Sequence, residues 1–175
     1  MMIILGIDPG IATMGYGIIN YFGASFNYIT CGAITTPAGE RVERRLALIY
    51  DQLNHIIKTY TPDSIAIEEL FFNTNQKTAI NVAQARGIAL LSAERAGIPL
   101  SEYTPLQVKQ AVVGYGRAQK HQVMEMTKIL LSLSETPKPD DAADALALAI
   151  CHAHNSSSKL SGYNTLNPTK KTGGK

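Results

Sequence analysis

The sequence has few of the features that mark secreted, membrane or zinc-binding proteins. Its two cysteines, Cys31 and Cys151, form no C-x-x-C pair, which predicts reduced thiols rather than a disulfide or a zinc site. The apolar run over 145–151 is far too short to cross a bilayer, and no basic leader precedes the first apolar run. No G-x-x-x-x-G-K pattern or Ser/His/Asp arrangement stands out. We therefore expect a cytosolic protein that contacts no membrane.

The chain also has little net charge, +2 from 16 basic and 14 acidic residues. Four of the lysines lie beyond residue 154, in a stretch without any acid, so the preceding residues hold 12 basic against 14 acidic side chains. Ser, Asn, Thr, Gly and Lys dominate this stretch, which predicts a disordered basic tail over 155–175. Residues 1–154, rich in apolar side chains, predict a single globular domain. Such a domain would bind an anionic partner through local patches rather than its overall charge.

The first apolar run ends on a single acid. Residues 2–7 are apolar or glycine, and Asp8 is followed by Pro9 and Gly10, which predicts a buried strand that stops at a turn. Asp8 would lie at the carboxyl end of that strand, where open α/β sheets bind ligands. An Asx-type turn with Pro9 is the structural alternative. Further strands over 15–21 and 26–35 predict an antiparallel meander.

A strand–helix–strand unit follows. Apolar residues at intervals of three and four predict an amphipathic helix over 40–60, whose arginines at 41, 44 and 45 we interpret as a solvated face. The apolar run over 64–72 predicts a strand parallel to the first, since a helix joins the two. Glu68 and Glu69 interrupt this run, and an acid there would lie beside Asp8. Phe71 follows, either as a core residue or as an aromatic that stacks on an unpaired base.

The middle of the chain predicts three helices and a basic surface. A helix over 73–96 contains many small residues and Gly87, so we consider it for a subunit contact, with packing on its own sheet as the alternative. A strand over 98–103 and a capping box at Thr104 precede a second helix. The break over 114–117 leads to a third, over 118–133. Four cations and one acid occupy residues 107–128, the cations being Lys109, Arg117, Lys120 and Lys128.

The last predicted helix begins with acids. Asp140 suits a helix N-terminus, whereas Asp144 lies within an Ala-rich stretch and shares a helix face with Asp141. Two carboxylates on a buried face are unfavourable without a positive partner. We expect His152 and His154 to end this helix, where its dipole favours them.

Acids from three separate places could therefore meet in one cleft. Oxygen ligands without His or Cys favour a hard cation such as Mg²⁺. Two such ions about 4 Å apart can activate a water and stabilise the leaving oxygen of a phosphodiester. This interpretation assumes that the strands bearing Asp8 and Glu68 are neighbours.

Six motifs, in this order, resemble the RuvC family of bacterial Holliday-junction resolvases. The motifs are Gly6-Ile7-Asp8-Pro9-Gly10 with Gly15-Tyr16-Gly17, Ala66-Ile67-Glu68, Gln84-Ala85-Arg86-Gly87, Gln107-Val108-Lys109 and Asp141-Ala142-Ala143-Asp144-Ala145-Leu146-Ala147. The resemblance implies an α/β, ribonuclease H-like fold with a five-stranded mixed sheet flanked by helices. It also implies a cytoplasmic homodimer that resolves four-way DNA junctions by paired symmetric nicks, in recombination and repair. The nicks would leave a 5′-phosphate.

The same resemblance assigns roles to individual residues. The acidic quartet of the family falls on Asp8, Glu68, Asp141 and Asp144, which would hold Mg²⁺, two ions per site, with Mn²⁺ as a substitute. Its DNA contacts fall on Phe71, Lys109 and Lys120, to which the basic segment adds Arg117. Asp140 and Glu69 are neighbouring acids outside the pattern, either of which could contribute to metal binding. The branch-migration complex RuvA–RuvB is a partner by resemblance only.

Three other functions remain open from the sequence. The Asp-x-Gly strand is also found in smaller ribonuclease H-like nucleases that process RNA, such as those resembling YqgF. Gly6-Ile7-Asp8-x-Gly10 resembles the first phosphate loop of actin-like ATPases, although the chain is short for two such lobes. A DNA-binding module without catalysis is the third, and the presence of all four acids argues against it.

Overall fold

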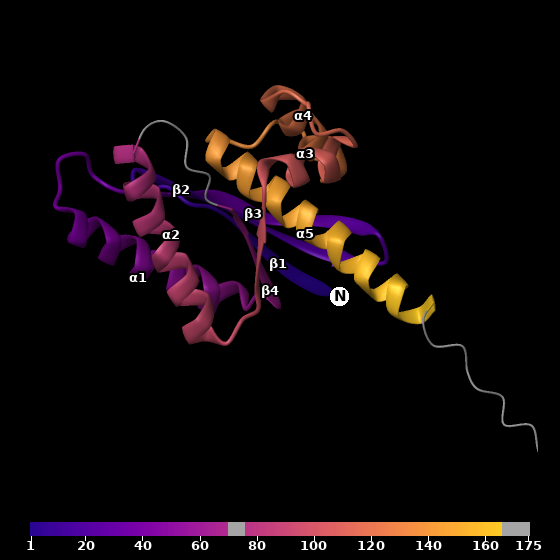
Figure 1. Ribbon diagram of the computed structural model, residues 1–175, viewed down its shortest axis with the longest axis horizontal. Helices are drawn as coiled ribbons and strands as arrows, with labels where there is room; N and C mark the ends of the chain where they lie inside the picture. The colour runs from indigo at the N-terminus through magenta and orange to yellow at the C-terminus, as the bar shows by residue number, and fades with distance from the viewer. Residues whose placement is uncertain (70–75, 166–175) are drawn as a thin grey trace, which may run out of the picture.

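The computed structural model describes residues 1–69 and 76–165, with the side chains of 76–78 and 157–165 excepted. The described residues form a sheet between two layers of helices (Figure 1). The strands are β1 (Met2–Asp8), β2 (Thr13–Phe22), β3 (Ser25–Thr35), β4 (Ser64–Glu68) and β5 (Leu100–Tyr103). The helices are α1 (Val42–Tyr60), α2 (Gln76–Ala96), α3 (Pro105–Val113), α4 (Lys120–Leu130) and α5 (Asp140–Thr165).

The sheet is mixed, with β1 at its centre. Its strand order is β3-β2-β1-β4-β5, with β1 antiparallel to β2 and parallel to β4. The predicted parallel pair is therefore confirmed, and β5 extends it in parallel beyond β4. Because β1 and β4 are parallel neighbours, the carboxyl ends of both strands, Asp8 and Glu68, lie at the same edge of the sheet.

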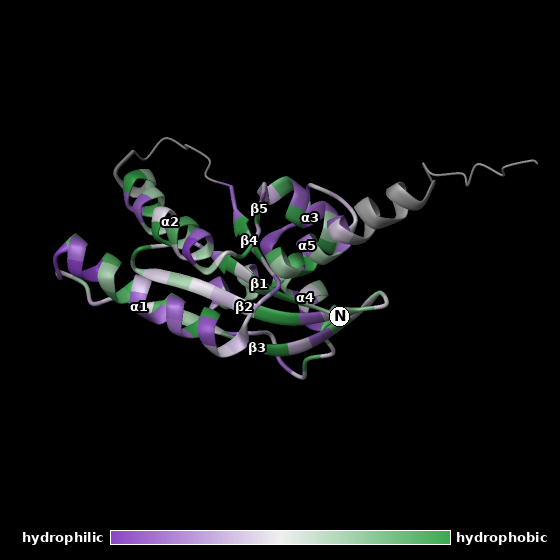
Figure 2. Cartoon of the chain, turned by 90° about the horizontal axis from the view of Figure 1, so that it is seen from below, coloured by the Kyte–Doolittle hydropathy of each residue, from purple (hydrophilic) through white to green (hydrophobic). Residues whose placement is uncertain are grey.

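Alternation along the strands divides the side chains between two cores. Leu5 and Ile7 of β1 pack with α1 and α2 on one face, whereas Ile4 packs with α5 on the other. Figure 1 shows α5 crossing the sheet on the side away from α1 and α2. Figure 2 shows polar and apolar bands along α1, as expected for a helix with one buried stripe. Asp8 is in phase with Ile4, so its side chain belongs to the α5 face.

Glycines let α5 lie directly on the strands. A Cβ atom added to Gly6 would collide with the carbonyl oxygen of Ala145, and one added to Gly15 would collide with that of Asp141. The first turns of α5 therefore lie over β1 and β2 without side chains between their backbones. This close approach brings the acids of α5 to the edge of the sheet where β1 ends.

Two elements end elsewhere than the sequence predicts. β4 ends at Glu68, since its partner β5 ends at Tyr103 and the Glu69 amide donates the last bond of the pair to the Tyr103 carbonyl. The prediction for Phe71 lies outside the described residues. α5 continues to Thr165, past the predicted start of the tail, so His152 and His154 lie within the helix, and the prediction that they end it was wrong.

The predicted five-stranded mixed sheet flanked by helices is confirmed. Over the described part of the chain, no helix combines the length and the hydropathy that a membrane span requires.

Candidate active site

Three acids from three elements line one pocket. Asp8 ends β1, Glu68 ends β4, and Asp144 lies one turn into α5. The pocket holds about 190 Å³. Its lining residues are Asp8, Glu68, Pro105, Val108, Lys109, Lys120, Val123, Asp144, Ala147 and Leu148. The sequence-based expectation that separated acids converge is therefore met by three of the four.

The fourth acid contributes charge without lining the pocket. Asp141 lies one helical turn before Asp144, and its backbone carbonyl faces Gly15 of β2. Its carboxylate is nevertheless close enough to raise the pKa of Asp8. Asp141 is half-buried and does not line the pocket.

The pocket disfavours the ionised form of Asp8. Burial, then the charges of Glu68, Asp144 and Asp141, raise the pKa of Asp8 from 3.8 to about 7, against the opposing effect of Lys120. Burial also raises the pKa of Glu68, as does the charge of Asp144. At both carboxylates, burial and the neighbouring acids together outweigh the opposing effect of Lys120 on the pKa.

Among the described residues, Lys120 forms the ion pairs with the acids at the start of α5. Its Nζ lies 3.0 Å from Oδ2 of Asp144 and 3.4 Å from Oδ2 of Asp140. Burial alone would lower the pKa of Lys120, but the hydrogen bond and charge of Asp144, together with those of Asp140, raise it overall. Burial raises the pKa of Asp144, while the bond from Lys120 lowers it. Lys120 thus links the start of α4 to the start of α5.

Of the other two basic residues predicted to contact DNA, one lies in the pocket and one outside it. Lys109 of α3 lines the pocket. Arg117 is exposed in the turn between α3 and α4 and does not line it. Two acids near the quartet also lie outside the pocket lining: Glu69 is exposed, and Asp140 contacts Lys120 at the entrance to α5.

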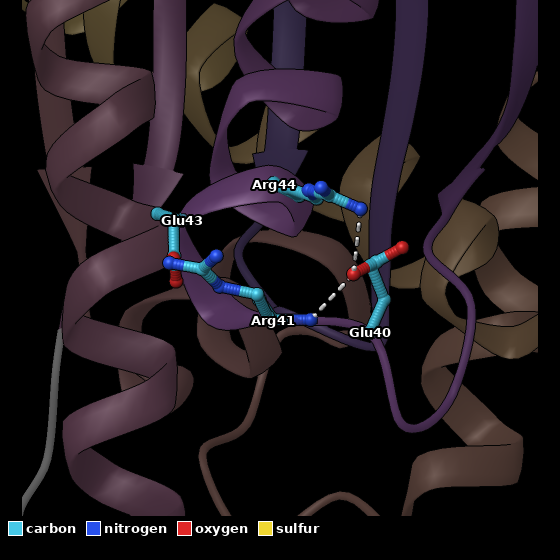
Figure 3. Close-up of polar contacts among 4 residues, drawn as sticks. All are labelled: Glu40, Arg41, Glu43 and Arg44. Atoms are coloured by element: carbon cyan, nitrogen blue, oxygen red, sulfur yellow. Dashed lines mark hydrogen bonds and ion pairs between the residues drawn. The ribbon is translucent and has the colours of Figure 1, made fainter.

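The arginines at the start of α1 serve local structure. Figure 3 shows Arg41 beside Glu43, with which it forms an ion pair, and Arg44 beside Glu40, 3.6 Å away. Arg45 donates from Nε to Oγ1 of Thr36, at 2.7 Å. Arg41 and Arg44 are exposed, as the interpretation of a solvated face expects, whereas Arg45 is part-buried and bonded to the preceding loop. None of the three lines the pocket.

The apolar walls of the pocket were missed from the sequence. Ala147 and Leu148 lie three and four residues after Asp144, so they share its helix face. On α3, the same spacing of three and four residues places Val108 and Lys109 on the helix face of Pro105. Once Asp144 and Lys109 were singled out, helical spacing could have identified their neighbours as pocket walls.

The donor set fits a hard divalent cation. Asp8, Glu68 and Asp144 offer carboxylate oxygens alone, which suit Mg²⁺ or Mn²⁺ better than Zn²⁺. Among the side chains that the structure describes, no three of His, Cys, Asp and Glu are close enough to form a ready-made metal cluster. Mg²⁺ does not need one, because it keeps several waters and binds through one or two carboxylates and substrate phosphates. The raised pKa of Asp8 marks the charge that a cation would neutralise.

A family model and several sequence relatives point to the same family. Residues 4–152 match the family model described as crossover junction endodeoxyribonuclease RuvC. The protein of that name from Alkaliphilus oremlandii is 62% identical over 153 residues, which cover 87% of this chain and 93% of the relative. The one from Clostridioides difficile is 60% identical over 154 residues, with 88% and 91% covered.

A solved structure agrees with these relatives. The structure of T. thermophilus RuvC in complex with a Holliday junction substrate is 35% identical, with a TM-score of 0.87. The similarity covers 91% of this chain and 97% of that one.

Proposed function

The chain belongs to the RuvC family of crossover junction endodeoxyribonucleases, and from this premise we propose that it cuts four-way DNA junctions with the pocket of Asp8, Glu68 and Asp144. The convergence of these carboxylates from three elements, beside Lys109 and Lys120, is the observation that carries the proposal. Cleavage at two symmetric positions would resolve the junction during recombination and repair. The proposed chemistry is phosphodiester hydrolysis.

Asp8, Glu68 and Asp144 are proposed to hold Mg²⁺, with Asp141 as a further ligand and Mn²⁺ as a substitute. When bound, the divalent ions supply Lewis acidity and a more acidic water. Asp8 and Glu68 end the central strands β1 and β4, whose pairing fixes the positions of their backbones. Asp144 on α5 faces them from the other layer. The apolar walls formed by Val108 and Leu148 limit the water that reaches the carboxylates and strengthen their electrostatic interactions.

Lys109, Lys120 and Arg117 are proposed to bind backbone phosphates. The first two line the pocket, so they would contact phosphates next to the scissile bond. Arg117, exposed beyond the start of α4, would contact a phosphate further along the strand. These cations position DNA without reading its sequence. Phe71 follows the strand that carries Glu68, and its proposed role is stacking on an opened base.

A homodimer is proposed to make the paired nicks. Ile80, Gly87 and Leu91 lie on one exposed face of α2, while Ala85 and Ala89 are buried against the sheet. Apart from the nearby backbone of α2 itself, no described atom lies within 4 Å of a Cβ placed on Gly87, so its missing side chain leaves room for a second chain. A two-fold dimer would present two pockets to a junction with its own two-fold axis.

Further parts of the proposal come from family membership alone. They are the branch-migration complex RuvA–RuvB as a partner and a bacterial cytoplasmic location. The proposed division into a nuclease domain over 1–154 and a basic tail over 155–175 rests on composition, and α5 runs into that tail as far as Thr165.

The test is cleavage of a synthetic four-way junction, with each strand labelled in turn. We expect nicks in Mg²⁺ on two opposing strands at equivalent positions, and little cleavage of a linear duplex of the same sequence or of an RNA duplex. The Glu69→Gln variant serves as the control, since Glu69 lies outside the pocket and should leave the rate unchanged. Equal cleavage of linear duplex, or cleavage of RNA alone, would contradict the proposed function.

A further inference from the structure

Lys120 forms an ion pair with Asp144, a carboxylate that is proposed to bind the divalent cation. Nζ of Lys120 lies 3.0 Å from Asp144 and 3.4 Å from Asp140, and both Lys120 and Asp144 line the pocket with Asp8 and Glu68. Lys120 is 54% exposed, Asp140 is 62% exposed and Asp144 is 34% exposed. The ammonium is thus an internal counter-ion with an open path to solvent.

We propose that Lys120 is a positioning residue that alternates between two partners. It neutralises Asp144 while no divalent cation is bound, and it moves to a substrate phosphate when Asp144 takes part in binding one. This inference rests on the proposed function and adds to it the order of events. Phosphate binding by Lys120 follows metal binding instead of preceding it.

Asp144 cannot bind Lys120 and a divalent cation through the same oxygen without strong repulsion between the two cations. The carboxylate already accepts a bond from an ammonium with unit charge, and a divalent cation at the same oxygen would repel that ammonium at short distance. Lysine suits such an exchange because its charge lies at the end of a flexible four-carbon stem. Asp140, at the exposed entrance to α5, offers an intermediate partner on the way to solvent.

Lys109 provides the matched comparison. It lines the same pocket, yet the ion pairs found among the described residues do not include it. Both lysines add positive charge near the carboxylates, but Lys120 alone of the two occupies one of them. If positive charge alone weakened Mg²⁺ binding, removing either lysine would raise the Mg²⁺ affinity. If Lys120 competes with Mg²⁺ for Asp144, only removal of Lys120 would raise it.

Because Lys120 competes with Mg²⁺ for Asp144 but binds a DNA phosphate, it should weaken Mg²⁺ binding and strengthen junction binding. Removing it frees Asp144, so Mg²⁺ should bind more tightly in the absence of DNA. Because the phosphate contact is lost as well, junction DNA should bind less tightly. Since partly exposed ion pairs are weak, the expected gain in Mg²⁺ affinity is about two- to fivefold.

The first measurement is a titration of the full chain with Mg²⁺ in the absence of DNA, in which thermal unfolding at each Mg²⁺ concentration reports binding. We expect the apparent Kd for Mg²⁺ to fall by about two- to fivefold in Lys120→Gln and to stay nearly unchanged in Lys109→Gln. An unchanged or weaker affinity in Lys120→Gln, or an equal gain in Lys109→Gln, overturns the proposal. Circular dichroism of each variant before heating verifies the fold.

A second measurement uses the unaltered protein and so avoids any effect of substitution on folding. Lysine labelling by acetic anhydride, quantified by mass spectrometry, should be slow at Lys120 without Mg²⁺ and faster at saturating Mg²⁺. Lys58, exposed on α1, serves as the internal control and should not change. Equal labelling of Lys120 in both states overturns the exchange.

Neither measurement uses DNA or cleavage, so the two proposals fail separately. Loss of Mg²⁺-dependent junction cleavage with an intact Lys120 response would refute the proposed function alone. Normal cleavage without that response would refute the exchange alone.

Discussion

Replacing Asp8 with Asn should stabilise the protein when no divalent cation is present. The pocket raises the pKa of Asp8 from 3.8 to about 7, so the folded state holds this proton more tightly than the unfolded state does. Below pH 3.8 Asp8 is protonated in both states and imposes no penalty. As pH rises towards 7 the unfolded state loses the proton first, and the free energy of unfolding falls. Asn lacks this titration.

The size of the effect follows from the same pKa. The difference between 3.8 and about 7 corresponds to at most about 4 kcal/mol at 1.36 kcal/mol per pKa unit. Asp8 is only half-buried, and solvent screens its neighbours, so we expect about 1–2 kcal/mol above pH 8. For a chain of this size, that is a rise in Tm of about 2–4 °C per kcal/mol.

The assay is thermal unfolding of wild type, Asp8→Asn and Glu69→Gln in EDTA, at pH 4.5 and pH 8. Asp8→Asn should exceed wild type at pH 8, and the advantage should shrink at pH 4.5, while Glu69→Gln should follow wild type at both. Adding Mg²⁺ at pH 8 should stabilise wild type and reverse the order. Equal or lower stability of Asp8→Asn in EDTA at pH 8, or a difference independent of pH, would refute the electrostatic account of the pocket.

Three further predictions concern DNA binding, packing and assembly. Lys120→Ala should weaken junction binding and lower the slope of log K against log salt by about 1; an unchanged slope in a salt titration would exclude a phosphate contact. Gly6→Ala should lower the free energy of unfolding, measured in urea, by about 3 kcal/mol or more, because the added Cβ would collide with the carbonyl of Ala145. In contrast, Gly87→Ala should raise the stability of the dissociated monomer by about 0.5–1 kcal/mol, and equal effects of the two variants on the monomer would contradict the packing of α5. Leu91→Glu should weaken self-association in sedimentation equilibrium, and an unaltered dimer would move the interface away from α2.

The arrangement of the central strands was predictable because short-range rules determine it. A strand, a helical crossover and a second strand have one favoured geometry, and β1 and β4 adopt it. The choice of Glu68 over Glu69 was harder, since Glu68 follows an apolar run without clean alternation. In the structure Ile65 and Ile67 face α1 and α2, while Ala66 packs towards α5. Glu68 continues the Ala66 face and therefore meets the pocket.

Other features depend on contacts that no local pattern contains. Lys120 fits an outward position on an amphipathic helix, and only the docking of α4 against α5 brings it to Asp144. Asp141 shares a helix face with Asp144, yet it lies over Gly15 of β2 and does not line the pocket. Helical periodicity gives the face of a residue, but the crossing of two elements decides which neighbours it meets.

The end of the last helix also escaped prediction. Ser and Asn beyond residue 154 weaken helix propensity, but α5 continues through them to Thr165. Buried contacts earlier in the helix, including the 2.9 Å hydrogen bond between Tyr103 and His152, hold its preceding turns. Propagation of an existing helix costs far less than starting one, which is why composition alone placed the end too early.

The central claim is that the carboxylates gathered around Asp8 cut DNA with the help of a divalent cation. The most direct test compares wild type with Asp8→Asn on the same labelled four-way junction, with cleavage rate and binding affinity measured separately in Mg²⁺. The account predicts that Asp8→Asn still binds the junction but no longer nicks it, and that EDTA abolishes nicking by wild type. Cleavage by Asp8→Asn at the wild-type rate would contradict it.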